Sequence, residues 1–430
     1  MSKQRRAADS ERTSVELFAG GGGLAMAVEH AGFRPLLMNE FAKRACETLA
    51  ANCATPIDEG QEPAIPGRGE RPPLIVGDVR KVDFEYLRNR VDVLAGGPPC
   101  QPFSLGGVAK GDEDDRNGFP HMFRAIREMR PKAVICENVR GLLRPSFKPY
   151  FDYIKRELSL PFEERAEGSD WRDHDEILRH MGDSARVATD ESYDVEHFAV
   201  NAADYGVPQI RNRVIAIAFR RDLGVDMGRF KELVRPRYSD LSLYEDMHSG
   251  AYWDRHPEVP KAVRKRVMER IPAPQATLQD SEEDRLLPWR TLRDALKGIG
   301  EGQKPLPDVP PELLDRKEHN LGGFADHIGW PDARIYAGHT PNELDKPAKT
   351  VKAGVHGVPG GESVMLLDNG THRYMTVRET ARVMTFPDDW QLAGPRGEKM
   401  RQLGNAVPVL LGETFARAVA TVLEEAQPKK

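Results

Sequence analysis

The chain has 430 residues, of which 39 % are hydrophobic and 30 % charged, and its formal net charge is -5. This composition suits a folded protein with a sizeable core, and the length favours two domains. No run of 18 or more apolar residues appears, which argues against a membrane span. The basic stretch 1–14 has no apolar segment behind it, so we expect no secretory signal and a cytoplasmic protein.

The four cysteines are Cys46, Cys53, Cys100 and Cys136, and they form no C-x-x-C pair. No histidines cluster near them at metal-ligand spacing, so neither a zinc site nor a disulfide framework is expected. Reduced thiols are the simpler interpretation. The question is then whether one of these thiols is chemically active.

Short apolar runs alternate with helix-like segments in the first half of the chain. Strand patterns at 15–18, 35–38, 74–76, 91–95 and 133–136 alternate with helix patterns at 24–30, 42–51 and 121–129. This repetition predicts an α/β fold with a parallel sheet and helices on both faces. Ligands bind such sheets beyond the carboxyl ends of the strands.

The remaining sequence is less regular. Residues 55–73 and 161–192 are predicted to be exposed insertions, and the second is highly charged. Strands are predicted at 198–200 and 214–219, and frequent prolines and glycines from 222 to about 375 indicate a smaller domain with irregular loops. A helix over 377–384, a loop at 402–405 and a final helix over 409–423 are predicted to follow.

A basic cluster stands out in this acidic chain. It comprises Lys261, Arg264, Lys265, Arg266 and Arg270. Such a cluster is either a solvated helix face or a contact to phosphate groups, and the pattern does not decide between them.

Polar groups follow successive predicted strands. Glycines 20–23 separate a strand from a helix, where the backbone can approach a ligand and the helix N-terminus favours negative charge. Glu40 ends the second strand and could accept hydrogen bonds from ribose hydroxyls, and Asp78 ends the third and could accept one from an adenine amino group. Their shared position at strand ends predicts a nucleotide-like cofactor site.

The segment around Cys100 is the strongest chemical signal. Prolines 98, 99 and 102 flank this cysteine and restrict the backbone that presents its thiol at a strand end. Glu137 follows a neighbouring strand, so a thiol and a carboxyl group can meet for nucleophilic and acid–base work. Arg211 and Arg213 alternate where a strand begins, and we expect both on one face, steadying an anion or a substrate ring.

These motifs, taken in order, resemble the cytosine-C5 DNA methyltransferases. The matching segments are 18–23, Asn39-Glu40, 77–79, 98–101, 137–139, Gln209-x-Arg211-x-Arg213, Arg378-Glu379 and 402–408. The resemblance covers about residues 14–220 and 376–422 and implies a Rossmann-like sheet that binds S-adenosylmethionine. It also implies a catalytic domain made of residues 1–222 and 377–430, interrupted by a target-recognition domain at 223–376. In Pro347-Ala348-Lys349-Thr350-Val351, Thr350 is similar to the family's short threonine motif.

The resemblance also implies residue roles. Cys100 would attack cytosine C6 as a thiolate, Glu137 would hold or protonate N3, and Arg213 would favour the thiolate. Because a base inside a duplex is out of reach, the cytosine would be flipped out. Cofactor contacts are expected from Phe18, Ala19, Gly20, Gly22, Gly23, Leu24, Asn39, Glu40, Asp78, Val79, Pro98, Asn405 and Val407, and DNA contacts from Gln101, Ser104, Lys110, Arg116 and Thr350.

Three other interpretations compete with DNA cytosine methylation. A tRNA substrate would keep the fold and chemistry, but the long variable region favours DNA, because reading a duplex needs a separate module in the groove. A nicotinamide-dependent oxidoreductase explains the glycine loop and Glu40 but gives no role to Cys100 or Glu137. A DNA-binding regulator with a dead site is disfavoured because both of these residues are present. We expect a monomer acting on double-stranded DNA, without a metal; a separate restriction endonuclease and the DNA target stay open.

Overall fold

The computed structural model describes residues 11–57, 61–99, 117–182, 187–273, 285–300, 302–335, 337–353 and 363–426. The chain divides into two compact units. The first comprises Met1–Ala199, Val214–Leu233 and Phe415–Lys430, and the second comprises Val200–Arg213 and Val234–Thr414. The second unit thus adds 200–213 and 377–414 to most of the domain expected at 223–376, whereas residues 223–233 of that expected domain belong to the first unit.

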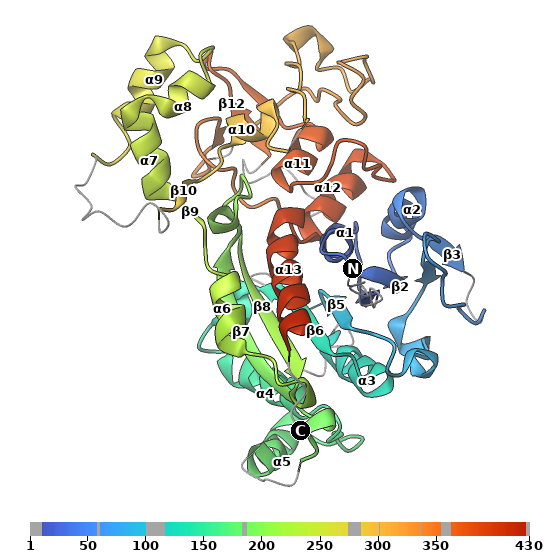
Figure 1. Ribbon diagram of the computed structural model, residues 1–430. Helices are drawn as coiled ribbons and strands as arrows, with labels where there is room; N and C mark the ends of the chain where they lie inside the picture. Colours follow the sequence, from blue (N-terminus) through green and yellow to red (C-terminus); the bar gives the residue numbers. More distant parts are fainter. Residues whose placement is uncertain are drawn as a thin grey trace, which may run out of the picture. The chain divides into compact units, whose positions relative to one another are not determined.

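An eight-stranded sheet forms the centre of the first unit (Figure 1). Its strands lie in the order β3-β4-β2-β1-β5-β6-β8-β7. They are β1 (Thr13–Leu17), β2 (Arg34–Glu40), β3 (Thr55–Ile57), β4 (Pro73–Val76), β5 (Val93–Gly96), β6 (Ala133–Val139), β7 (Tyr193–Asn201) and β8 (Asn212–Arg220). All pairs from β3 through β6 are parallel, so their carboxyl ends share one edge.

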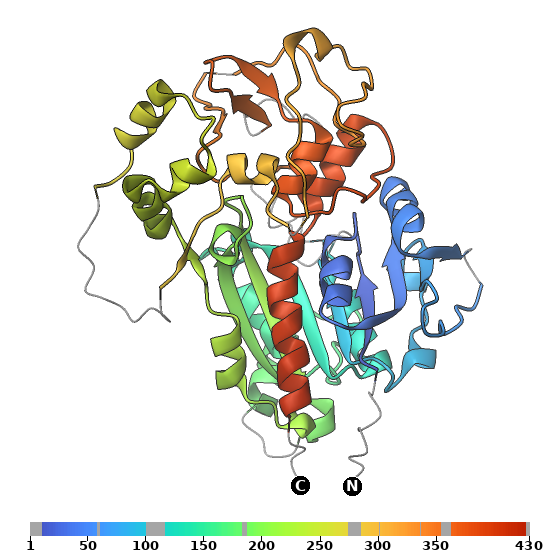
Figure 2. The same cartoon turned by 45° about the horizontal axis from the view of Figure 1, so that its top comes forward.

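Helices cover both faces of this sheet. Apolar side chains of α3 (Phe119–Met129), α4 (Lys148–Ser159) and α5 (Trp171–Gly182) form one core with residues of β1, β5 and β6. On the other face lie α1 (Gly23–His30), α2 (Lys43–Asn52), α6 (Met227–Leu233) and the end of α13 (Val409–Glu425), and Figure 2 shows α1 and α13 in front of the strands. Phe198 and Phe219 of the sheet pack against Phe230 of α6. The predicted α/β sheet with helices on both faces is confirmed.

The second unit consists of short elements. Its helices are α7 (Asp240–Ser249), α8 (Ala251–Arg255), α9 (Lys261–Met268), α10 (Leu292–Lys297), α11 (Val377–Val383) and α12 (Arg396–Asn405). Its strands are β9 (Tyr238–Ser239) with β10 (Leu287–Pro288), and β11 (Asn342–Glu343) with β12 (Val364–Leu366) and β13 (His372–Tyr374). Thr376 and Glu379 form a reciprocal capping box that starts α11.

Two local predictions were wrong, those for the loops at 402–405 and 55–73. The expected loop at 402–405 is the last turn of α12. The insertion expected at 161–192 contains the helix α5, which was not predicted. Many charged residues hide the helix pattern of α5 in the sequence. Some of these charges pair with α4, as Asp175 of α5 does with Arg156 of α4. The loop at 55–73 contributes the edge strand β3, which was missed because it is only three residues long.

One stretch of the described chain, Arg396–Glu425, is long and apolar enough to cross a membrane by length and composition alone. However, 67 % of its apolar window is buried inside the protein, as is usual for a core helix.

A buried carboxyl group on α4 predicts how stability depends on pH. Glu157 is 6 % exposed, and burial raises its pKa to about 7, against a smaller opposing effect of a hydrogen bond with Tyr153. Between the ordinary glutamate pKa near 4.5 and this value, the folded state holds a proton that the unfolded state has lost. Stability should therefore fall as pH rises through that window.

We expect Glu157→Gln to remove this loss, because the amide cannot ionise. The variant should exceed the parent in free energy of unfolding by up to about 3 kcal/mol at pH 8 and match it near pH 4.5. Urea unfolding across that range measures the difference. The exposed Glu176→Gln on α5 is the control; identical pH profiles for the parent and Glu157→Gln would contradict the prediction.

Candidate functional site

Glu40 connects the glycine loop after β1 to the end of β2. Its Oε2 accepts from Gly20 N at 2.7 Å, and its Oε1 accepts from Phe41 N at 2.8 Å and Ala42 N at 2.6 Å. Gly20 and Gly22 have φ of +55° and +89°, a left-handed conformation that glycine adopts without strain. A carboxylate offers about four lone-pair sites, so one remains for a ligand hydroxyl.

Asn39 positions the neighbouring strand end. Its side chain is buried, and Nδ2 donates to the carbonyl oxygens of Ile75 and Gly77, both at 3.1 Å. The amide therefore holds the backbone that leads into Asp78. A direct contact between Asn39 and the cofactor stays a prediction.

Asp78 lies beyond β4 and is paired with Arg80. Oδ1 accepts from Arg80 N at 2.9 Å and Oδ2 from Arg80 Nε at 2.7 Å. The side-chain hydrogen bond from Arg80 lowers the pKa of Asp78 to about 2, so the group is a carboxylate acceptor at neutral pH. Val79, its expected companion, is buried.

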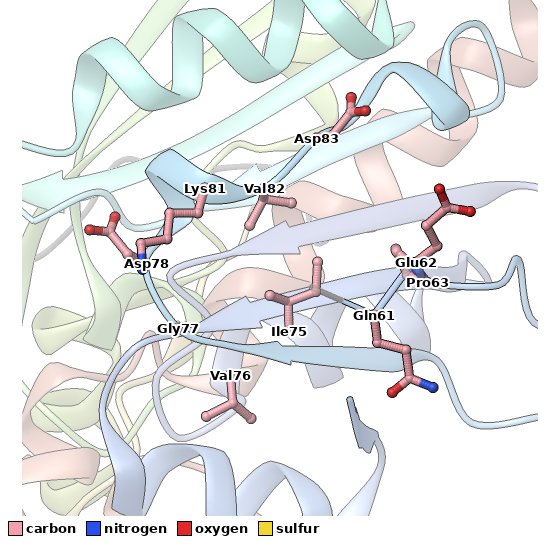
Figure 3. Close-up of a pocket in the computed structure, with 10 residues that line it drawn as sticks. All are labelled: Gln61, Glu62, Pro63, Ile75, Val76, Gly77, Asp78, Lys81, Val82 and Asp83. Atoms are coloured by element: carbon pink, nitrogen blue, oxygen red, sulfur yellow. The ribbon is translucent and has the colours of Figure 1, made fainter. Parts of the chain in front are cut away.

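A pocket of about 180 Å³ borders Asp78. Figure 3 shows Asp78 past the carboxyl end of β4 and Gln61 and Glu62 near the other end of the strand. Small-molecule sites usually enclose roughly 300–1,000 Å³. The volume of this pocket lies below that range.

Phe41 was missed by the sequence analysis. Its side chain is 75 % exposed, the highest value among the large hydrophobic side chains that the structure describes. It directly follows Glu40, at the same edge of the sheet as Phe18, which adopts a left-handed φ of +55°. An aromatic residue immediately after a strand-end acid was the available signal, since exposed apolar rings at such an edge suit a flat ring system.

The segment before Cys100 is fastened to the end of β6. Asn138 Nδ2 donates to Pro98 O at 3.0 Å, and Val139 N donates to Asn138 Oδ1 at 2.8 Å. Glu137 is buried, and a Cβ built on Gly97 would lie 3.6 Å from its Oε2. The structure thus brings Glu137 against the last residues before the predicted nucleophile. Asn138 was noted in the motif but was not assigned this positioning role.

Arg211 is a clamp within the second unit. It is 1 % exposed, and its guanidinium donates to Val351 O at 3.0 Å, Gly404 O at 2.8 Å and Ala406 O at 2.9 Å. These contacts join the 347–351 segment to the 402–408 segment. Arg211 is therefore a positioning residue in this structure, although it was predicted to act on the substrate.

Arg213 differs from Arg211. It is half-buried, and its Nη1 donates to Asn212 O at 2.8 Å. Both arginines were expected to point to one face of the strand. Their environments differ, because Arg211 is buried among carbonyl groups and Arg213 is only half-buried. Thr350 Oγ1 donates to Ile210 O at 2.8 Å, which holds it beside this strand. Asn405 is exposed and Val407 is buried.

Several predicted residues lie outside the described part of the chain, and their roles stay predictions. They are Cys100, Gln101, Ser104, Lys110 and Arg116. Four other predicted cofactor residues are buried. They are Ala19, Gly23 and Leu24 around the glycine loop, and Pro98 after β5. Within the described ranges, no group of three His, Cys, Asp or Glu side chains is arranged to hold a metal ion.

A model of the C-5 cytosine-specific DNA methylase family matches residues 12–160 and 173–421. The chain belongs to this family. It is a DNA (cytosine-5-)-methyltransferase that uses S-adenosylmethionine. The unmatched stretch between the two ranges falls inside the predicted insertion at 161–192.

Relatives of the methyltransferase match almost its whole length. It is 31 % identical over 420 residues to the type II methyltransferase M.PspPI of Psychrobacter sp. (strain TA137), covering 96 % of this chain and 80 % of the relative. It is 30 % identical to the type II methyltransferase M.Eco47II of Escherichia coli, with the same coverage. A solved E. coli structure, assigned as a prophage-encoded DNA modification methyltransferase, has a TM-score of 0.54 at 20 % identity, covering 96 % of this chain and 99 % of that chain, and supports the fold.

The two arginines should differ in their effect on stability. Arg211→Met leaves three buried carbonyl groups without their donor, which should lower the free energy of unfolding of the methyltransferase by about 3 kcal/mol. Arg213→Met should change it by less than about 1 kcal/mol. Urea unfolding of both variants measures this, and equal losses would contradict the clamp assigned to Arg211.

Proposed function

We propose that the methyltransferase modifies cytosine within one short DNA sequence through a covalent bond between Cys100 and C6 of a flipped base. The observation that carries this proposal is the burial of Glu137 against Gly97, three residues before Cys100. A thiol and a carboxyl group brought near one another suit an attack on the ring with simultaneous control of a ring nitrogen.

The residues at the sheet edge fit S-adenosylmethionine. Glu40 retains one acceptor site for a ribose hydroxyl, Asp78 offers a carboxylate for an adenine amino group, and Phe41 offers an exposed ring for the adenine face. When bound, this cofactor supplies an electrophilic methyl group on a sulfonium. Asn39 and Glu40 keep the two backbone loops in place for it. The methionine end would meet the glycine loop, and the cofactor roles of Asn405 and Val407 stay predictions.

The thiolate of Cys100 adds to C6, and Glu137 places a proton at N3, so the charge pushed into the ring is neutralised. C5 would then be nucleophilic toward the methyl group that S-adenosylmethionine supplies. Transfer of the C5 proton to water, return of the N3 proton to Glu137 and expulsion of Cys100 from C6 as a thiolate would restore the aromatic ring. Arg213 provides positive charge that favours the thiolate, whose pKa as a free thiol is about 8.5.

The second unit would read the DNA. A module separate from the cofactor sheet can follow base edges in the major groove, while the sheet holds the extruded cytosine. Gln101, Ser104, Lys110, Arg116 and Thr350 are proposed to contact the opened duplex. We further propose a cytoplasmic monomer without a metal, which protects DNA from a separate restriction endonuclease.

Cys100→Ala should abolish methylation of DNA by S-adenosylmethionine. Bisulfite sequencing of treated DNA should show protected cytosines in one short sequence with the parent and none with the variant. DNA in which 5-fluorocytosine replaces the target base should form a denaturant-resistant adduct with the parent, because the fluorine cannot leave as the proton does. Methylation of tRNA in place of DNA would contradict the proposed substrate.

Phe41→Ala should weaken cofactor binding by about 1–2 kcal/mol, a roughly 5- to 30-fold higher Kd, because the exposed ring is lost. Isothermal titration with S-adenosylhomocysteine measures this without turnover. The exposed Ile65→Ala, in the 55–73 segment, is a matched control. An unchanged Kd for Phe41→Ala would remove Phe41 from the cofactor site.

A further inference from the structure

Pro99 and Gly118 lie close together on either side of the segment that carries Cys100, and we call this contact the neck. Residues 100–116 lie outside the described part of the chain, which ends at Pro99 and resumes at Asn117. Gly118 N donates to Pro99 O at 3.0 Å, so the two ends of this segment are bonded to each other. A Cβ at Gly118 would lie 2.7 Å from Pro99 Cδ and 2.9 Å from Pro98 Cβ, which leaves no room for a side chain there.

Asn117 fixes the returning end. It is buried, and its Oδ1 accepts from Phe119 N at 3.3 Å at the start of α3. Its Nδ2 donates to the hydroxyl oxygen of Tyr150 at 2.6 Å, across 33 residues of sequence. Tyr150 lies on α4, so this hydrogen bond links the neck to a helix on the face of the sheet.

Helix α5 packs against the ring of Tyr150. The ring of Trp171, the first residue of α5, packs edge-on against Tyr150 with ring centroids 5.2 Å apart and an interplanar angle of 80°. A bidentate pair between Arg156 and Asp175, at 2.5 and 2.9 Å, ties α5 to α4. The insertion at 161–192 is thereby anchored to the helix that holds the neck.

We infer that Tyr150 is a positioning residue for the methyl-transfer reaction, which acts through Asn117 on the segment bearing Cys100 and is supported by Trp171 of the inserted helix. The inference rests on the proposed role of Cys100 as the nucleophile. Asn138 holds Pro98 on one side of this segment, whereas Tyr150 holds Asn117 on the other side. Because Pro98 and Asn117 flank the segment bearing Cys100, loss of a hydrogen bond at either of them is expected to lower the rate of methyl transfer.

The test is single-turnover methylation of a duplex by Tyr150→Phe, which removes the hydroxyl and keeps the ring against Trp171. We expect the methyl-transfer rate to fall about 10- to 100-fold, as small misplacements near reacting groups do. The Kd for S-adenosylhomocysteine and the Kd for DNA should stay at the parent values, because no cofactor contact is changed.

Tyr153→Phe is the matched control. Tyr153 is also buried on α4 and also packs on Trp171, but its hydroxyl lies 3.1 Å from His174 Nδ1 and not at the neck. It should lose stability to a similar or greater extent while keeping the parent rate. Rate losses that follow the melting temperatures of the two variants would show a merely structural role and overturn the inference.

A double-mutant cycle identifies the path of the effect. In an Asn117→Ala background, Tyr150→Phe should cause no further loss of rate, since the hydrogen bond is already absent. Additive losses would overturn the inference even if either single variant is slow.

Cys100→Ala in the same assay separates the two proposals. Residual methylation by that variant would overturn the nucleophile assignment and, with it, the basis of the inference. If Cys100→Ala loses all methylation and Tyr150→Phe keeps the parent rate, only the positioning role of Tyr150 would be overturned.

Discussion

The carboxylate of Glu40 accepts hydrogen bonds from three backbone N–H groups, and the cofactor edge depends on them. Two belong to the turn that follows β2 and the third is Gly20 N in the loop after β1. Because β1 and β2 are adjacent and parallel, their carboxyl ends lie close enough for one side chain to reach both loops. Asn39 extends the link to the end of β4 by donating to Ile75 O and Gly77 O.

The same device recurs wherever the chain must hold a loop. Asn138 donates to Pro98 O, Asn117 donates to Tyr150, and Arg211 donates to three carbonyl oxygens of two segments. A buried amide or guanidinium satisfies backbone groups that no strand or helix pairs, and leaving them unpaired would cost about 1–3 kcal/mol each. These hydrogen bonds therefore fix both the polar side chains and the loops that they contact.

The polar and aromatic residues at the carboxyl edge of the sheet have two roles: some hold the backbone, and others face outward. Asn39 and Asn138 are enclosed, so they position backbone and do not offer groups to a substrate. Phe41 is exposed and Asp78 is partly exposed, and Arg80 keeps Asp78 ionised, which suits contact with a ligand. A reaction that needs a thiol, a carboxyl group and a sulfonium in one place requires such rigid support, since positional error is costly in rate.

The sequence by itself determined the α/β class, the strand ends that carry the polar residues, and the family, because short motifs in a fixed order depend on local chemistry. It could not separate Arg211 from Arg213, which share one motif, because burial by Val351, Gly404 and Ala406 comes from segments 140 or more residues away. Nor could it show α5 as a support, since the Trp171–Tyr150 contact exists only after the two helices pack. Tertiary structure alone decided these roles, because they depend on which distant carbonyl groups and rings folding brings within bonding distance.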